Sequence, residues 1–249
     1  MMKDAGADIG RIRSLLESGA NPNQLRDGHT ALHNAAERGS TRGMDLIITY
    51  GANVQLKTRP HQETALHLAT YDGDISKLQS LLKQRADVDA QNADGDTTLH
   101  LAILRFRTTE AMELLLSNGA STETKGRNGY TPLQYAISLD LEEKARFLLD
   151  YNASPNAQDR CGRMPLHKAI ASDKLTLAFI KRLVEAGADI DQKDKNKRSP
   201  LYEAAKCNKR DIMHYLVDSG ASREIGSSGM ERRLQWVQFW RELPWPFGG

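Results

Sequence analysis

Histidine and cysteine are the residue types in this 249-residue sequence that would bind a metal ion or act as a base and a nucleophile. Four of the seven histidines recur at intervals of about 33 residues or twice that, namely His33, His67, His100 and His167. If each lies in its own helix-wide unit of a stack, neighbouring side chains are about 10 Å apart, whereas zinc ligands lie about 2 Å from the ion. The spacing therefore argues against a shared metal site.

The remaining candidates for chemistry do not form a catalytic set. Cys207 and His214 are expected in different helices of one unit, and a catalytic pair would also need an orienting group and an oxyanion site. His29 and His61 have no cysteine or carboxylate at ligand spacing, and the sequence contains no glycine-rich phosphate loop. We expect no catalytic residue, no metal and no cofactor.

Two motifs repeat in fixed phase along the chain. The first recurs every 33 to 35 residues, beginning at Thr30, Thr64, Thr97, Thr131, Met164 and Ser199, and reads Thr-Ala-Leu-His in its first copy. The second, typified by Leu115-Leu116 followed by Gly119-Ala120, keeps the same period about 22 residues behind the first. A fixed period of this length is the signature of a stacked repeat array.

The two motifs resemble the ankyrin repeat over about residues 5–225. The resemblance implies an all-α solenoid of stacked antiparallel helix pairs with protruding β-hairpin loops, and a role in binding proteins. It also implies that the four repeated histidines hydrogen-bond the backbone of neighbouring hairpins. We expect a partial repeat at 1–25, six repeats and a Trp-rich tail that is a possible capping helix, with the limits 26–57, 58–91, 92–125, 126–158, 159–193, 194–225 and 226–249.

Each repeat carries signals for two helices. Thr97 is suited to cap the first helix, and Gly119 is suited to the left-handed position that ends the second. Arg85 occupies that glycine position in another repeat and should cost on the order of 1 kcal/mol there.

Both ends of the chain differ from a full repeat. Ile9, Ile12, Leu15 and Leu16 have the spacing of a second helix whose first helix is missing or degenerate, so that either the native protein is longer or this end is frayed. In the tail, Trp236 and Trp240 lie near other apolar residues at helical spacing, which fits a cap on the last repeat, a docking segment for a partner, or a disordered or truncated end.

Composition limits the partners and the compartment. A net charge of +2 with 27% charged residues does not predict bulk attraction to nucleic acid or to a membrane. Cys161 and Cys207 do not suggest a disulfide framework, and neither an 18-residue apolar run nor a leader is visible. We expect a monomer in the cytoplasm or the nucleus.

The surfaces that ankyrin proteins commonly use are the hairpin tips and the inner face of the first helices. The tips are rich in basic residues and suggest an acidic or phosphorylated partner. Exposed apolar residues flanked by charge on the inner helices fit a binding hot spot, unless they pack between repeats. The candidate contact residues are Arg59, His61, Tyr71, Leu104, Arg105, Arg127, Tyr130, Arg160, Arg163, Lys195, Arg198, Trp236 and Trp240.

The favoured function is a non-catalytic scaffold for protein binding. One alternative is an adaptor whose repeats select a client while the Trp-rich tail recruits a second protein. Another is the regulatory repeat portion of a longer enzyme. A nucleic-acid binder is disfavoured, because the sequence has no basic helix and no aromatic platform for base stacking.

Overall fold

The computed structural model describes residues 4–222, with side chains described from residue 9 onward. The chain divides into two compact units, Met1–Arg127 and Asn128–Gly249. A single 3-10 turn, η1 (Arg127–Gly129), spans the division, and its Asn128 has a left-handed φ of 61°. The predicted tail, including Trp236 and Trp240, lies outside the described residues.

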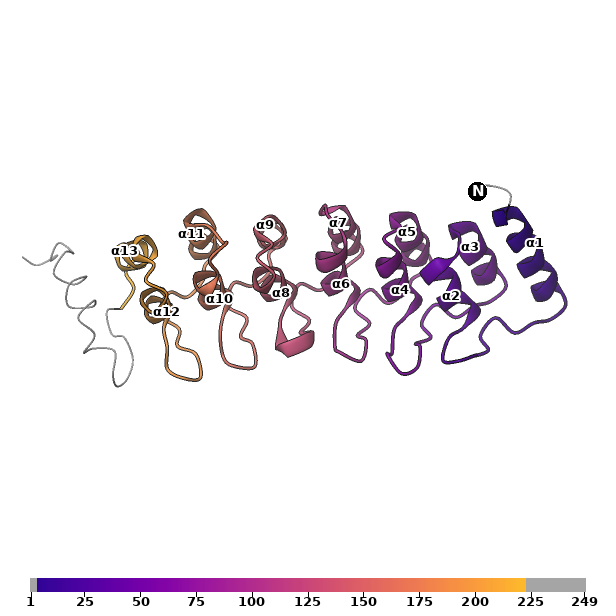
Figure 1. Ribbon diagram of the computed structural model, residues 1–249, viewed down its shortest axis with the longest axis horizontal. Helices are drawn as coiled ribbons and strands as arrows, with labels where there is room; N and C mark the ends of the chain where they lie inside the picture. The colour runs from indigo at the N-terminus through magenta and orange to yellow at the C-terminus, as the bar shows by residue number, and fades with distance from the viewer. Residues whose placement is uncertain (1–3, 223–249) are drawn as a thin grey trace, which may run out of the picture. The chain divides into compact units, whose positions relative to one another are not determined.

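The first unit contains one lone helix followed by three helix pairs. Its helices are α1 (Asp4–Glu17), α2 (Ala31–Arg38), α3 (Thr41–Thr49), α4 (Ala65–Asp72), α5 (Ile75–Lys83), α6 (Thr98–Arg105) and α7 (Glu110–Ser117). Within this unit, α2, α4 and α6 form an inner row beside the loops, and α1, α3, α5 and α7 form the outer row (Figure 1).

The described part of the second unit contains three more pairs of the same kind (Figure 1). They are α8 (Pro132–Ser138) with α9 (Glu142–Asp150), α10 (Pro165–Ala171) with α11 (Leu177–Glu185), and α12 (Pro200–Lys206) with α13 (Arg210–Asp218). The all-helical arrangement confirms the predicted ankyrin-type fold class, and residues 4–222 contain no extended strand.

Local sequence signals explain where the helices begin and end. Thr97 caps α6 as predicted, and proline fills the first position of α8, α10 and α12, where its missing N–H needs no partner. After the outer helices the chain turns through a left-handed residue, which is glycine at Gly119 and arginine at Arg85, with φ values of 89° and 59°. Arg85 therefore adopts the unfavourable conformation that the sequence predicted.

The core lies between neighbouring pairs, because no single pair can bury its apolar face alone. In the first unit the inner helices bury small residues such as Ala69 and Ala102, while Leu78, Met112 and Leu115 of the outer helices are fully buried. Small residues on the inner row let the helices approach closely, and large apolar residues of both rows supply the buried apolar surface.

The loops between the pairs are hairpin-like, with isolated antiparallel bridges at Arg26–His29 and Lys57–Thr64. Backbone hydrogen bonds join successive tips in the first unit. Arg59 N–H donates to Gly28 O at 2.9 Å, and Ala93 N–H donates to His61 O at 2.8 Å. The long tip around Arg59 is thus hydrogen-bonded to the preceding tip and to the following tip. Of the helices in residues 4–222, none has both the length and the apolar character needed to cross a membrane.

Candidate functional site

An exposed leucine lies next to an arginine–tyrosine pair on the inner row of the first unit. Leu104, in the last turn of α6, is 51% exposed, although its neighbour Ile103 is fully buried. The guanidinium carbon of Arg105 lies 5.0 Å from the ring centroid of Tyr71 on α4, which is cation–π geometry. We call Tyr71, Leu104 and Arg105 the Tyr71 cluster.

The Tyr71 side chain is also fixed by a carboxylate. Burial raises the pKa of the Tyr71 phenol, and a hydrogen bond to Glu63 together with the negative charge of Glu63 raises it further, while Arg105 opposes the rise. The phenol therefore stays protonated and donates to Glu63. Because Glu63 holds the hydroxyl and Arg105 covers the ring, the aromatic side chain is held in one orientation beside the exposed Leu104.

Two predicted tip residues of the first unit, Arg59 and His61, are exposed. Arg127, a third, is bound to acidic side chains: it pairs with Asp94, its Nε lies 3.7 Å from Asp96 Oδ2, and its backbone N–H donates to Asp96 Oδ1 at 2.7 Å. The two aspartates offset the charge of Arg127. Within this unit, Arg59 and Arg105 are therefore the predicted arginines better placed to meet an acidic partner.

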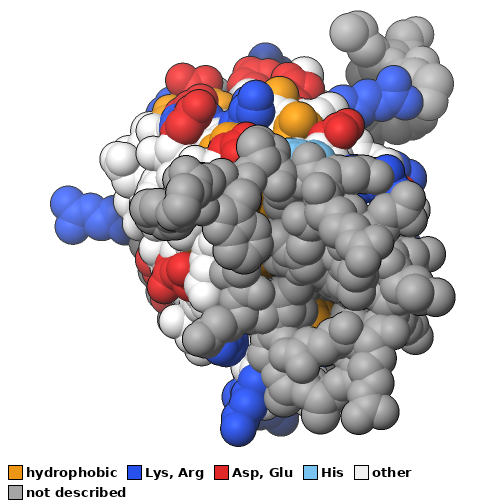
Figure 2. Space-filling view, turned by 90° about the vertical axis from the view of Figure 1, so that its left-hand side faces the viewer, with side chains coloured by type: hydrophobic (Ala, Val, Ile, Leu, Met, Phe, Trp, Pro, Cys, Tyr) orange, Lys and Arg blue, Asp and Glu red, His pale blue; other side chains and the backbone are white. Residues whose placement is uncertain are grey.

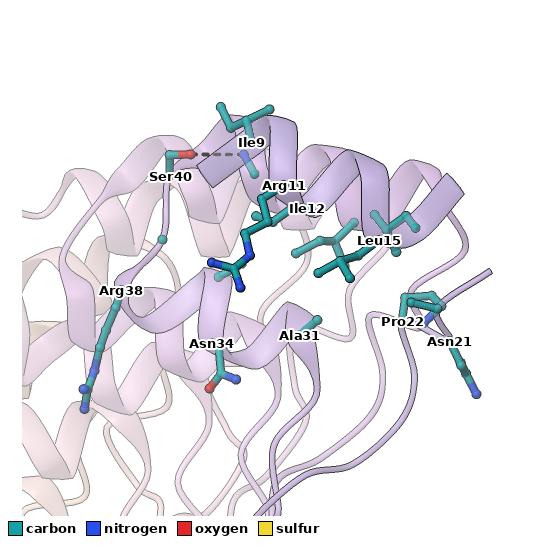
Figure 3. Close-up of a pocket in the computed structure, with 16 residues that line it drawn as sticks. Ile9, Arg11, Ile12, Leu15, Asn21, Pro22, Ala31, Asn34, Arg38 and Ser40 are labelled. Atoms are coloured by element: carbon teal, nitrogen blue, oxygen red, sulfur yellow. Dashed lines mark hydrogen bonds between the residues drawn. The ribbon is translucent and has the colours of Figure 1, made fainter. Parts of the chain in front are cut away.

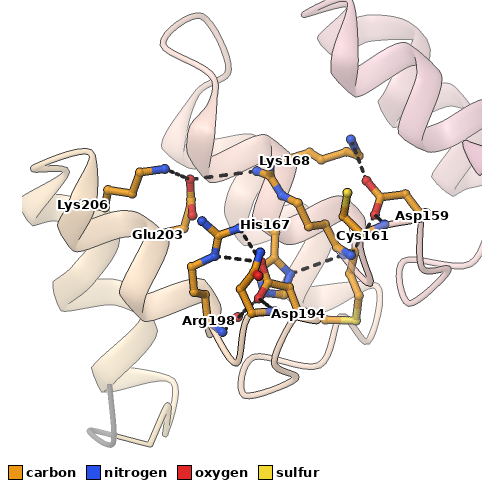
Figure 4. A network of polar contacts seen from close by, with 11 residues as sticks. Asp159, Cys161, His167, Lys168, Asp194, Arg198, Glu203 and Lys206 are labelled. Carbon is orange, nitrogen blue, oxygen red and sulfur yellow. Dashed lines mark hydrogen bonds and ion pairs between the residues drawn. The ribbon is translucent and has the colours of Figure 1, made fainter. Parts of the chain in front are cut away.

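Acidic neighbours also offset most of the predicted arginines of the second unit (Figure 4). Arg198 pairs with Asp194 at 2.9 Å, and Arg163 lies 3.9 Å from Glu203. Burial raises the pKa of the Asp194 carboxyl, but hydrogen bonds from the backbone and side chain of Arg198 outweigh this and lower it below its ordinary value. The Arg163–Glu203 pair joins a loop to α12, whereas the Arg198–Asp194 pair lies within a single loop.

Tyr130, another predicted contact, lies beneath a lysine. Lys168 Nζ is 3.7 Å from the Tyr130 ring centroid and 3.0 Å from Asp159 Oδ2, so that Lys168 joins an aromatic ring to a buried carboxylate. Arg160 and Lys195 are exposed, and the backbone N–H of Lys195 donates to Cys161 O at 3.0 Å. Arg127, Arg163 and Arg198 are thus engaged in ion pairs, although Arg127 is also exposed, whereas Arg160 and Lys195 are exposed residues for which no ion pair is found among residues 9–222.

The exposed charges on one face of the molecule are mixed in sign. Along the upper edge of the view in Figure 2, Lys and Arg side chains lie among Asp and Glu side chains. A surface of this kind favours recognition through local arrangements of charge over attraction to a polyanion.

Three of the four repeated histidines have the structural role that the ankyrin resemblance implied. Nε2 of His33, His67 and His167 contacts the backbone oxygens of Leu56, Asp96 and Arg198 at 2.9, 3.2 and 3.0 Å. Burial lowers the pKa of each of these three imidazoles, that of His67 to about 4. Within residues 4–222, no three His, Cys, Asp or Glu side chains are grouped as a metal ion would require.

The sequence analysis missed two lysines that the fold buries. Lys77 on α5 is fully buried, donates to Ala36 O at 3.1 Å and pairs with Asp72 at 2.8 Å. Lys144 on α9 is also buried. Each lysine lies directly before a buried apolar residue of its outer helix. The residue at the equivalent position of α3 is Gly43. A lysine at a position otherwise filled by small or apolar residues was the available signal.

Comparison with known proteins agrees with the geometry. The family described as ankyrin repeats (3 copies) matches residues 4–92, 66–159 and 152–226, and the chain belongs to this family. The ankyrin repeat domain of Bcl-3, described as a member of the IkappaB protein family, has a similar solved structure. Its TM-score is 0.76 at 28% identity, with 86% of this chain and 93% of that chain covered.

Curated relatives show the same repeats within longer proteins. The B-cell lymphoma 3 protein homolog of Mus musculus is 32% identical over 225 residues, which is 87% of this chain and 49% of the relative. ZDHHC13 of Danio rerio, which is named as a palmitoyltransferase, is 30% identical over 209 residues, or 83% of this chain and 32% of the relative. The chain thus spans half or less of the length of these relatives.

Proposed function

We propose that this chain is a non-catalytic protein-interaction scaffold whose contact surface is centred on the Tyr71 cluster, with the neighbouring tip residues Arg59 and His61 at its edge. Membership of the ankyrin repeat family supports the general role. The observation that carries the specific proposal is Leu104, which is 51% exposed beside an ordered arginine–tyrosine pair.

The composition of the Tyr71 cluster fits a binding hot spot. Burying Leu104 against a partner removes apolar surface from water, and tyrosine and arginine are enriched among the residues that dominate binding energy. Since Glu63 and Arg105 already fix Tyr71, little side-chain entropy is lost when a partner binds. The partner we propose presents an apolar side chain to Leu104 and an acidic or phosphorylated group to Arg105.

The test compares two exposed leucines of the same unit. Leu104→Ala should abolish partner capture from a cell lysate, whereas Leu25→Ala, at a leucine that is 39% exposed, should leave capture unchanged. Both variants should keep the unfolding free energy within about 1 kcal/mol of the parent, because neither side chain is in the core. Equal capture by both variants would refute the proposed surface, and strong destabilisation by Leu104→Ala would assign Leu104 to packing.

A matched pair of arginine variants tests whether binding depends on the charge of Arg105 itself. Arg105→Ala should weaken capture and reduce its dependence on salt, while Arg107→Ala, at another exposed arginine two residues away, should do neither. If both arginine variants behave alike, the acidic-partner part of the proposal is wrong.

The regulatory portion of a longer enzyme is the second candidate, and the match to ZDHHC13 favours it, because similar repeats occur there within a protein named for a catalytic activity. An immunoblot of the native protein tests this candidate. A mass well above 27.7 kDa would support it, and a mass near that value would contradict it.

The adaptor alternative rests on the Trp-rich segment and predicts that a 1–225 truncation loses a second protein while it keeps the client.

The predicted repeat limits, the monomeric state and the cytoplasmic or nuclear location also belong to the proposal. Light scattering and cell fractionation test the last two.

A further inference from the structure

Thr108 is an exposed threonine in the loop that joins α6 to α7. The loop covers residues 106–109, and Phe106 at its start has an extended conformation, with a φ of −87° and a ψ of 143°. Among residues 9–222, no hydrogen-bond partner is found for the Thr108 hydroxyl. An enzyme can therefore reach this hydroxyl without unwinding a helix or breaking a hydrogen bond of the side chain.

The chain just before Thr108 is positively charged. Arg105 lies three positions before it and Arg107 lies directly before it. Both arginines are exposed, and neither is found in an ion pair with a carboxylate among residues 9–222. From Arg105 to Thr109 the chain has two positive charges and no negative charge. Because complementary charge speeds and orients association, this segment suits an enzyme whose substrate cleft is acidic.

The same arginine spacing occurs once more in the sequence, before Ser14, where the structure differs. Arg11 and Arg13 occupy the equivalent positions, and Ser14 is also exposed. However, Ser14 lies inside α1, which is continuous between Arg11 and Leu15 (Figure 3), and its hydroxyl donates to Gly10 O at 3.1 Å. A cleft that takes an extended segment could bind this site only after α1 unwinds locally. The loop between α6 and α7 therefore offers the better acceptor.

We propose that Thr108 is a phosphorylation site for an ATP-dependent protein kinase that recognises Arg105 and Arg107. The transfer forms a bond between Thr108 Oγ1 and the γ-phosphorus of ATP. It breaks the bond from that phosphorus to the β,γ-bridging oxygen and releases ADP and the hydroxyl proton. The modified side chain has a charge of about −1.5 to −2 at neutral pH.

Phosphate on Thr108 acts on the Tyr71 cluster, and this part of the inference rests on the proposed function. Three residues of chain span at most about 11 Å, which is close to the Debye length of about 8 Å at physiological salt. The phosphate therefore offsets the charge of Arg105 and repels an acidic group that a partner presents there. Phosphorylation of Thr108 releases such a partner.

Site mapping tests the modification without the partner. The full chain is incubated with MgATP and the catalytic subunit of cyclic-AMP-dependent protein kinase, which selects arginine before the acceptor, and the products are mapped by tandem mass spectrometry. In the folded chain Thr108 should be modified at least about tenfold faster than Ser14, because α1 holds Ser14 in a helix. Synthetic peptides of residues 8–17 and 102–111 serve as the control. The first, with Ser14, should be modified at least as fast as the second.

Matched arginine variants test the recognition. Arg107→Ala should slow the modification of Thr108 about threefold or more, whereas Arg13→Ala, at the equivalent position before Ser14, should leave it unchanged. Equal effects of the two variants would contradict recognition of the loop segment.

The release of the partner is tested with a second pair of variants. The probe is the captured protein that Leu104→Ala loses. Thr108→Glu should weaken its capture about threefold or more at low salt, whereas Thr108→Gln, which has a similar shape without the charge, should leave capture close to that of the parent. Thr108 is exposed, so both variants should keep the unfolding free energy of the parent within about 0.5 kcal/mol.

The two parts of the inference fail separately. Absence of phosphate on Thr108, or modification of Ser14 at an equal rate in the folded chain, would overturn the phosphorylation site. Phosphate on Thr108 with equal capture by the glutamate and glutamine variants would overturn the release of the partner. If Leu104→Ala loses no protein, the proposed contact surface fails and the release fails with it, while the mapping still decides the phosphorylation site.

Discussion

Replacing His67 with glutamine should make the protein less sensitive to acid. In the folded protein, Nδ1 of His67 accepts the Thr64 N–H at 3.2 Å, and Nε2 faces Asp96 O at the same distance, which places the proton of the neutral ring on Nε2. A second proton on Nδ1 would remove the acceptor for Thr64 N–H inside a buried site. Burial and this arrangement favour the neutral ring.

The magnitude follows from linkage. The pKa of His67 is about 4 in the folded protein and 6.5 in the unfolded chain, so the unfolded chain binds more protons between these values and stability falls as the pH falls through that window. Between about pH 7.5 and about pH 5, His67 alone should remove about 2 kcal/mol of unfolding free energy.

Glutamine already serves at the equivalent position of another repeat, which makes His67→Gln a conservative test. Gln134 donates through Nε2 to the backbone oxygens of Ala157 and Arg163, each at 2.9 Å, and accepts the Thr131 N–H at 3.2 Å. Urea unfolding followed by far-UV circular dichroism should show that the variant loses about 2 kcal/mol less than the parent on acidification. Equal losses in the two proteins would refute the reasoning.

Three further substitutions test the packing. Lys77→Met should lower the unfolding free energy by about 1–3 kcal/mol, since it leaves Ala36 O and Asp72 without their buried donor; an unchanged urea midpoint would contradict this. Arg85→Gly should raise it by about 1 kcal/mol by relieving a left-handed φ of 59°, and a lower melting temperature would count against that strain. Phe179→Ala, at a fully buried side chain of α11, should cost about 3–5 kcal/mol in thermal unfolding, and a cost below about 1 kcal/mol would mean that α11 is loosely packed.

The sequence was sufficient for the fold because the repeat signals are local. Caps such as Thr97, prolines at the first helical position and left-handed residues after the outer helices each act within a few residues. The contacts of the repeated histidines with neighbouring loops followed from the family resemblance, and the structure confirms them for His33, His67 and His167.

The state of the basic tips could not be predicted in the same way. Arg127 is offset by Asp94, which lies 33 positions earlier in the chain and is adjacent only because the tips stack. Whether an arginine at such a tip is exposed or paired depends on the side chains of the neighbouring tip. The half repeat was the sequence signal that α1 lacks an inner partner among residues 4–222, but the volume of the groove beside it, about 840 Å³, depends on how α1 packs against α2 and α3 (Figure 3).

The central claim is that the Tyr71 cluster contacts a protein partner, and site-specific photo-crosslinking tests it most directly. A benzophenone side chain placed at Leu104 should yield a discrete crosslinked partner in cells, and one placed at the exposed Leu25 should not. Crosslinking from Leu25 alone, or to the same partner with equal yield from both positions, would contradict the claim.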